Sequence, residues 1–358
     1  MKTIFRWGAK QMKKFMSSIA VLAVVAGILS GCGSSDSADN GASDESGSKK
    51  LVVYTPNSED MINILIPMFE KETGITVELV SAGTGELLKR LQSEKDNPYA
   101  DVMFGGAYAL FMGNADLFAE YVSPNDEFMM EGHHNETGYI TSYISDASVL
   151  LVNKNLAGDI PITSYEDLLN PELKGKIATA DPASSSSAFA QLTNILKAKG
   201  GDYESDAGWD YVGKLIQNLD GKIASGSSAA HKSVADGEYV VALTYEDPAA
   251  SYVKSGAPVE IIYPEEGAVF LDAVAGVVEG AENEENAQKF IDFIISKNAQ
   301  DVFGTQLTNR PLREDAELGS HMKPMSEINI VDEDDEYVRD HKTEIIERYT
   351  DLFTSLQD

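Results

Sequence analysis

The chain has 358 residues, and its 58 acidic side chains outnumber its 28 basic ones to give a formal net charge of −30. Because nucleic-acid phosphates are bound by basic surfaces, this charge argues against a nucleic-acid partner. A small anionic ligand is not excluded, since backbone N–H groups can make one pocket locally positive on an acidic protein. The length allows two domains, each with its own core.

The N-terminus has the pattern of a secretory signal peptide rather than of a folded element. Five basic residues lie within the first 14 positions, and residues 19–29 form a short apolar run. Such a run is short for a membrane span and is typical of a removable signal, here residues 1–31. The adjoining Leu29-Ser30-Gly31-Cys32 resembles a bacterial lipobox, which implies that Cys32 carries a lipid and becomes the mature N-terminus.

Cys32 is the only cysteine of the chain, so no internal disulfide can form and stability must come from the core. A lone exported cysteine needs an explanation, which favours lipid anchoring over an ordinary signal peptide with an incidental cysteine. The stretch that follows is rich in Ser, Gly, Asp and Asn and has no apolar periodicity. We therefore expect residues 32–50 to form a lipid-anchored, flexible tether between the membrane and the folded domain.

Residues 51–106 alternate between strand and helix patterns in the order β–α–β–α–β, the unit of an open α/β sheet. Strands are predicted near 51–54, 76–80 and 100–104, with an amphipathic helix in each interval. Small polar residues follow the strands, where such sheets bind ligands and where helix N-termini attract anions. The candidate ligand-binding residues of this region are Asn57, Ser58, Ser81, Gly83, Thr84 and Gly106.

Motifs of metal and enzyme chemistry are not convincing in this chain. His133 and His134 lie in a polar stretch, but adjacent histidines point apart in regular structure and no third ligand is suitably spaced. We find no Gly-x-Ser-x-Gly elbow, no His-Glu-x-x-His and no Cys-x-x-Cys motif. We therefore expect no functional metal, no cofactor and no enzymatic activity.

An apolar strand at 145–153 is interpreted as a crossover, because a second α/β pattern follows it. A capping box at 163–169 predicts a helix, and a strand at 175–180 runs into serines that open another helix at 189–196. One N-cap serine would suffice for capping, so the additional serines favour an anion site. A similar junction lies at 223–228. The candidates from both junctions are Ser184, Ser185, Ser186, Ser225, Ser227 and Ser228.

A further strand at 237–243 leads to Tyr245, Glu246 and Asp247. Two acids and a phenol at the end of a buried strand are candidates for ligand binding, because ionisable groups in such places are often functional. The alternative is that the acids cap the helix at 249–255.

The last third of the chain is expected to return to the first domain. A strand at 259–263 precedes a return crossover at 264–278 and a strongly amphipathic helix at 283–296. The acidic run 332–336 is interpreted as a solvated loop. The tail at 344–356 is predicted to be an amphipathic helix that packs on the first domain.

These segments together resemble the solute-binding proteins of bacterial ABC importers, in the branch that covers ferric iron, phosphonates and sugar phosphates. The matching pieces are 51–54, 69–75, 100–102, Asp181-Pro182 with its serines, 237–247, 263–267, 283–295 and Asn309-Arg310-Pro311. The resemblance implies an α/β, two-lobed, type II periplasmic-binding-protein-like fold that closes around a ligand at two hinge crossovers. Lobe 1 is expected at 51–147 and 273–358, and lobe 2 at 148–272.

The resemblance also implies partners and a location. It implies a monomer with an importer permease and ATPase complex as partner. It places the protein outside the cytoplasm, either anchored by the Cys32 lipid to the outer face of the cell membrane or periplasmic. Sequence does not separate such a protein from a sensory module of the same fold that presents its ligand to a membrane receptor.

The ligand implied by the resemblance depends on where this chain departs from the iron binders. Those members use two adjacent tyrosines on lobe 2, whereas this chain has Tyr245 followed by Glu246 and Asp247. Hydroxyl groups and helix N-termini from both lobes better suit a phosphonate, a sugar phosphate or another organophosphate, with the two acids on its organic part. Ferric iron remains an alternative ligand. Hydrolysis of small phosphate esters remains an alternative function.

Overall fold

The computed structural model of the chain describes residues 48–357. The expected signal peptide, the lipidation site Cys32 and most of the expected tether lie outside the described residues. None of the helices within residues 48–357 is long and apolar enough to cross a membrane.

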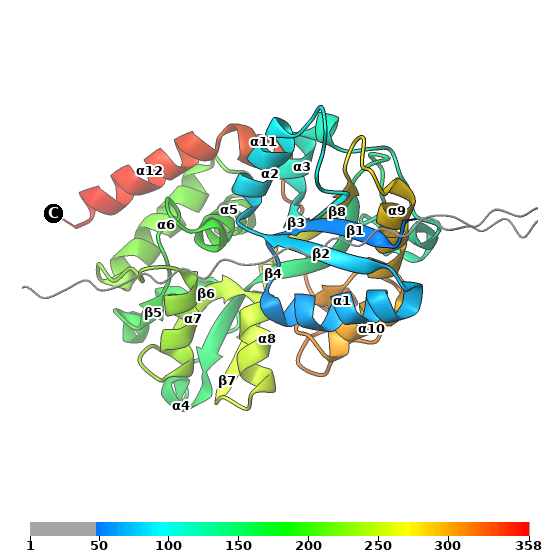
Figure 1. The fold of residues 1–358 in the computed structure, drawn as a ribbon. Coiled ribbons are helices and arrows are strands. Elements are labelled where there is room, and N and C mark those ends of the chain that lie inside the picture. Colours follow the sequence, from blue (N-terminus) through cyan, green and yellow to red (C-terminus); the bar gives the residue numbers. More distant parts are fainter. Residues whose placement is uncertain (1–47, 358) are drawn as a thin grey trace, which may run out of the picture. The chain divides into compact units, whose positions relative to one another are not determined.

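The predicted β–α–β–α–β unit is present at the start of the folded chain (Figure 1). Strands β1 and β2 pair in parallel, as do β1 and β3. Ser58 caps α1 by accepting a hydrogen bond from the Met61 N–H, and Gly74 ends the helix at a φ of 71° that favours glycine. The elements are β1 Lys50–Thr55, α1 Glu59–Thr73, β2 Thr76–Ser81, α2 Thr84–Ser93, β3 Val102–Ala107 and α3 Tyr108–Met112, followed by the 3-10 turns η1 Ala115–Leu117 and η2 Pro124–Phe128.

A long strand, β4 (Thr141–Asn153), connects the two halves of the sheet. Its first half pairs antiparallel with β8 and β9, and its second half pairs antiparallel with β6 and β7. The main path of the sheet follows the order β2-β1-β3-β8-β4-β6-β5. This arrangement confirms the predicted strand at 145–153 as a crossover and brings β8, from the predicted return crossover, beside it.

The second half of the chain supplies the remaining elements. The capping-box helix is shorter than expected and forms only 3-10 turns, whereas α6 was not anticipated from the sequence. The elements are α4 Lys154–Ala157, η3 Glu166–Leu169, η4 Pro171–Leu173, β5 Ile177–Ala178, α5 Ser186–Gly200, α6 Asp206–Leu219, α7 Ser227–Ala235, β6 Val241–Tyr245, α8 Glu246–Lys254, β7 Val259–Ile262, β8 Phe270–Val277, α9 Glu284–Ile294, α10 Lys297–Thr305, β9 Arg310–Pro311, η5 Met325–Glu327, α11 Asp335–Asp340 and α12 Lys342–Ser355.

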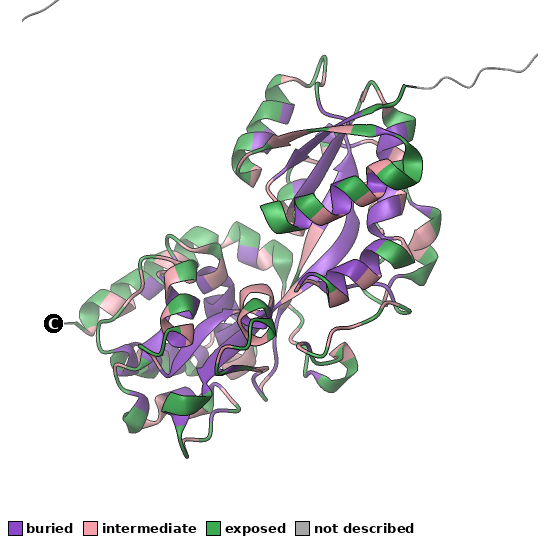
Figure 2. Cartoon of the chain, turned by 60° about the horizontal axis from the view of Figure 1, so that its bottom comes forward, coloured by how far each residue is buried: buried purple, intermediate pink, exposed green. Residues whose placement is uncertain are grey.

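The buried apolar residues gather around the two halves of the sheet, on the strands and on the helix faces that cover them (Figure 2). The first core covers the β1–β3 half on both faces, and its aromatic centre is the edge-to-face pair Phe69–Phe290, with ring centroids 5.1 Å apart. The second core lies around β4, β5 and β6 and contains Trp209, Leu196 and Val241. Each half therefore has the apolar interior of a separate folding unit.

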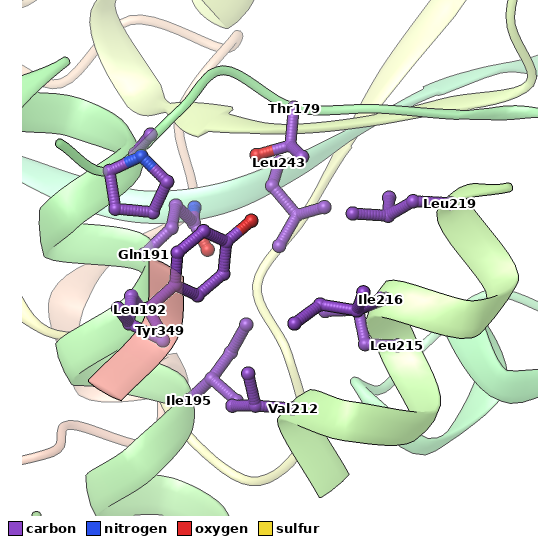
Figure 3. A pocket seen from close by; sticks show the side chains of 12 residues that line it. Thr179, Gln191, Leu192, Ile195, Val212, Leu215, Ile216, Leu219, Leu243 and Tyr349 are labelled. Atoms are coloured by element: carbon purple, nitrogen blue, oxygen red, sulfur yellow. The ribbon is translucent and has the colours of Figure 1, made fainter. Parts of the chain in front are cut away.

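The C-terminal helix corrects one expectation. It was predicted to pack on the first domain, but α12 lies along α6, and Ile345 and Tyr349 belong to the second core. Figure 3 shows Tyr349 among apolar residues of α5 and α6, beside a gap of about 30 Å³. The sequence shows that this helix has an apolar face, but an apolar face alone does not say which core it covers.

Because the chain ends on the second core, it crosses between the cores once more than the two expected crossovers. Leu312 belongs to the first core and Val338 to the second, so the segment between them makes this third crossing. The acidic run 332–336 lies on this segment. Its residues are exposed except for Glu333, whose pKa burial raises to about 7.

Candidate functional site

A cavity lies where the second core meets the crossover strands. It has a volume of about 510 Å³, within the range of small-molecule sites. Its walls come from β4, β6 and β8 and from the N-terminal ends of α5 and α7. The lining residues are Asp146, Ser148, Ser184, Ser185, Ser186, Ser187, Ala190, Gly226, Ser227, Tyr245 and Leu271.

One wall is the N-terminus of α5, which the serine-rich junction forms. Ser185 is the N-cap and accepts a hydrogen bond from the Ala188 N–H at 3.3 Å, while its hydroxyl lies 3.2 Å from that of Ser187. The backbone N–H groups of Ser184 and Ser185 are used within the loop, where both bond the carbonyl of Asp181. The first N–H groups of a helix have no partner inside the helix, so this end attracts anions.

A second helix N-terminus opens on the same cavity. The N-cap of α7 is Gly226, so no side chain caps its first N–H groups, and Ser227 at the first helical position lines the cavity. An isolated parallel bridge between Ala180 and Ala224 holds the two preceding loops side by side. The bridge explains why two helix N-termini distant in sequence converge on one cavity.

The strands that line the cavity carry a carboxyl group and a phenol. Asp146 of β4 accepts a hydrogen bond from the Asp247 N–H at 3.1 Å and so caps α8 from a neighbouring strand, because α8 has no side-chain cap of its own. Burial and two nearby acids, Asp247 and Glu246, raise the pKa of Asp146 well above its usual range. Burial also raises the pKa of Tyr245 to about 12, so its phenol is neutral and can donate a hydrogen bond.

Glu246 was predicted to bind ligand, and the structure places it in an ion pair instead. Its side chain is 1% exposed and accepts two hydrogen bonds from the guanidinium of Arg310, one of them at 2.8 Å, and one from the Tyr263 hydroxyl. With its charge neutralised and its oxygens occupied, Glu246 does not line the cavity. Its sequence neighbour Asp247 accepts a hydrogen bond from Thr308, and burial raises its pKa. Asp247 does not line the cavity either.

The candidates from the first half of the chain form a separate group and do not line the cavity. Asn57 donates to the Phe104 carbonyl and accepts from the Tyr143 hydroxyl. Gly106, at a φ of 133°, lies against Thr84, since a Cβ on Gly106 would be 2.9 Å from the Thr84 methyl. Ser58 and Gly83 are the N-caps of α1 and α2, and Ser81 ends β2. These residues share one edge of the sheet, at the carboxyl ends of β1, β2 and β3.

The predicted residues that the cavity brings together are Ser184, Ser185, Ser186, Ser227 and Tyr245. Ser225 and Ser228 are exposed and lie outside it. The lining residues that were not among the candidates are Asp146, Ser148, Ser187, Ala190, Gly226 and Leu271. Asp146 did carry a signal, because it is the only charged residue in the 13-residue strand β4.

The two adjacent histidines take separate hydrogen bonds, as their divergent directions predict. His133 contacts Asp272 at 2.8 Å, and His134 contacts Asp126 at 3.2 Å. Within residues 48–357 no group of three or more His, Cys, Asp or Glu side chains is arranged to hold a metal ion. The oxygen donors that face the cavity are the serine hydroxyls, the Tyr245 phenol and the Asp146 carboxylate.

Several known proteins with similar sequence or structure are named as binding or uptake proteins. Residues 51–306 match a protein family described as "Bacterial extracellular solute-binding protein". A putative 2-aminoethylphosphonate-binding periplasmic protein of Salmonella typhimurium is 29% identical over 253 residues, which are 69% of this chain and 72% of that protein. Iron uptake protein A1 of Synechocystis is 29% identical over 307 residues, 80% of this chain and 82% of that protein.

A solved structure shares the fold. A periplasmic binding protein of Actinobacillus pleuropneumoniae, with fructose-6-phosphate bound, superposes with a TM-score of 0.70 at 24% identity, covering 85% of this chain and 98% of that one. At this level of identity the likeness establishes the two-lobed α/β fold and not the ligand.

Proposed function

Since the chain belongs to the bacterial extracellular solute-binding proteins, we propose that it captures a small anionic solute, a phosphonate, sugar phosphate or other organophosphate, for an ABC importer. The observation that carries this proposal is the convergence of the α5 and α7 N-termini, with their serines, on one cavity of about 510 Å³. Two helix N-termini and several hydroxyl groups match the oxygens of a tetrahedral anion. No Lys, Arg or His belongs to the described lining, so backbone dipoles would supply the attraction.

The other half of the proposed site is the edge formed by Asn57, Ser58, Ser81, Gly83, Thr84 and Gly106. Hinge closure about β4 and β8 would bring this edge over the bound solute. We place the lobe boundaries near residues 147 and 272, as the sequence predicts, and assign the tail from Asp335 to lobe 2 because α12 packs on the second core. In this proposal lobe 2 holds the anion first, and lobe 1 excludes water from it.

We propose that the protein acts as a monomer outside the cytoplasm, tethered through a lipid on Cys32, and delivers its solute to a permease and ATPase complex. Its role is binding and not catalysis. This part of the proposal rests on the sequence pattern of residues 1–50 and on the family.

Relatives are named for a phosphonate, for iron, and for spermidine and putrescine, so three ligand classes are candidates. The serine-lined helix N-termini favour the phosphorylated or phosphonate class. Ferric iron, which prefers anionic oxygen ligands, is the second candidate, and Tyr245 with Asp146 would be its donors on lobe 2.

The test is a thermal-shift screen of the purified protein with phosphonates, sugar phosphates, inorganic phosphate and ferric citrate. A solute at a hundred times its Kd stabilises the folded protein by about 2.7 kcal/mol, which raises the melting temperature measurably. Ser227→Ala should weaken binding of any phosphorylated hit, whereas Ser228→Ala, an exposed neighbour outside the cavity, is the matched control. A shift with ferric citrate alone contradicts the ligand class, and phosphate release from an ester hit contradicts a pure binding role.

A further inference from the structure

The described lining of the cavity contains one carboxyl group and no basic side chain. Asp146 is the only ionisable acid or base among the described lining residues apart from the phenol of Tyr245. The N-termini of α5 and α7, at Ser185 and Ser227, attract negative charge in the same cavity. The lining therefore combines helix ends that favour an anion with one acidic side chain.

Among the neighbouring acids, Glu246 has a counter-charge in the protein, whereas Asp146 has none among the described residues. Glu246 is paired with Arg310 at the buried junction of α8 and β9. Asp247 accepts a hydrogen bond from Thr308, although Asp60 of α1 adds a further negative charge near it. None of the ion pairs within residues 48–357 involves Asp146, whose carboxylate accepts hydrogen bonds only from backbone N–H groups of Asp247 and Glu246.

A purely anionic solute would bring more negative charge towards this carboxylate. A cationic group on the same solute would reverse the sign of that interaction and supply the counter-charge that the protein lacks. Leu271, the partner of Asp146 on β8, is 36% exposed and offers an apolar surface for methylene groups of the solute.

We propose that Asp146 binds the ammonium group of a zwitterionic solute and thereby selects amino-phosphonates or amino-phosphates over analogues with an uncharged tail. This inference rests on the proposed function, because it needs the anionic end to bind at α5 and α7. Tyr245 of β6 pairs with Ser148 of β4, and both residues line the cavity together with Asp146. Asp146 is the specificity-determining residue, whereas the helix N-termini bind the phosphonate group of any solute that has one.

Asp146 also caps α8, so its charge has to be separated from its capping role. Asn is as good a cap as Asp because its side-chain oxygen accepts the same hydrogen bond. Asp146→Asn therefore keeps the cap and removes the charge, and Asp146→Ser repeats the test with a different uncharged acceptor if the first variant unfolds. Asp247→Asn, which removes a neighbouring charge outside the cavity, is the matched control.

The experiment is calorimetric titration of the purified protein and its variants with 2-aminoethylphosphonate and with propylphosphonate, in which a methyl group replaces the ammonium. A hydrogen bond between charged groups predicts a preference of the wild type for the amine of about tenfold to a hundredfold. Asp146→Asn should abolish this preference and bind propylphosphonate more tightly than the wild type does, because a repelling charge is gone. Asp247→Asn should keep the preference.

Equal binding of the two phosphonates by the wild type, or an unchanged preference in both Asp146 variants, would overturn the inference and leave the proposed function intact. Binding of neither phosphonate would remove the proposed ligand class and the inference with it. Binding of putrescine in preference to both would show a site for cations alone, which contradicts the inference and the anionic class together.

Discussion

The buried pair of Glu246 and Arg310 allows a sharp test of whether Glu246 belongs to the framework or to the ligand site. Both side chains are at most 2% exposed. The Arg310 Nε donates to Glu246 at 2.8 Å, and its Nη2 also donates to the Lys323 carbonyl at 2.7 Å. The pair joins α8 of the second core to β9, which hydrogen-bonds to the first half of β4. The perturbation is Glu246→Leu.

The expected cost follows from what the substitution leaves behind. Removing the carboxylate strands the Arg310 charge in an interior position, and breaking a buried pair in this way costs about 3–5 kcal/mol. Arg310→Leu should cost a similar amount because it strands Glu246. The double variant removes both charges and should recover most of the loss, since apolar replacements of a whole buried pair are often neutral or stabilising.

The assay is urea unfolding followed by circular dichroism, with a double-mutant cycle over the four proteins. Lys297→Ala is the control, because the Lys297–Asp301 pair on α10 is partly exposed to solvent and is worth less than about 1 kcal/mol. Solute affinity of the folded fraction should not change in Glu246→Leu. Single variants that lose under about 1 kcal/mol, or a loss of affinity with unchanged stability, would refute the reasoning and return Glu246 to the ligand site.

Three further predictions concern a turn, the tail and the cavity acid. Gly105→Ala should lower the free energy of unfolding by about 1–3 kcal/mol, because Gly105 has a φ of 112° and the new Cβ would lie 2.7 Å from the Asn57 Oδ1. The control is Gly85→Ala, whose Cβ meets nothing within 4 Å. Equal melting temperatures of the two variants would contradict the prediction. Tyr349→Ala should lower the free energy of unfolding by about 3–5 kcal/mol if α12 is part of the second core, and a loss no larger than that of the exposed Thr350→Ala would mean that the tail is not docked. Without solute, Asp146→Asn should raise the melting temperature more at pH 8 than at pH 4. The pKa of Asp146 is higher in the folded protein than in the unfolded chain, so its carboxyl group lowers the stability as the pH rises from the unfolded pKa through the folded pKa. The variant has no carboxyl group and does not lose this stability. A pH-independent effect contradicts that assignment.

The local sequence pattern was sufficient to predict most of the helices and strands, because the residues that begin and end each of them lie close together in the sequence. The β–α–β–α–β unit is confirmed with Ser58 and Gly74 at the ends of α1, where a cap and a left-handed glycine are required. The serine-rich junctions were also recognisable, since Ser185 and Ser227 stand where strands end and helices begin. Alternation of strand and helix was thus enough to identify an open α/β sheet, whereas the two-lobed arrangement was implied by the resemblance to solute-binding proteins.

Long-range pairing was out of reach of the same reasoning. Glu246 is separated from Arg310 by 64 residues, so nothing near Glu246 shows that its charge is already neutralised. Glu246 therefore does not line the cavity, and Asp146 of the crossover strand is the one carboxyl group in the described lining. The docking of α12 was missed for a related reason, because an amphipathic helix fits any apolar surface of suitable shape.

The most direct test of the central claim is a crystal structure of the protein grown with 2-aminoethylphosphonate. The account predicts the phosphonate oxygens at the N-termini of α5 and α7, within hydrogen-bond distance of Ser227 and the first N–H groups of α5, and the ammonium at the Asp146 carboxylate. A phosphonate bound elsewhere, or a ligand whose ammonium contacts Glu246 while Arg310 is displaced, would contradict it.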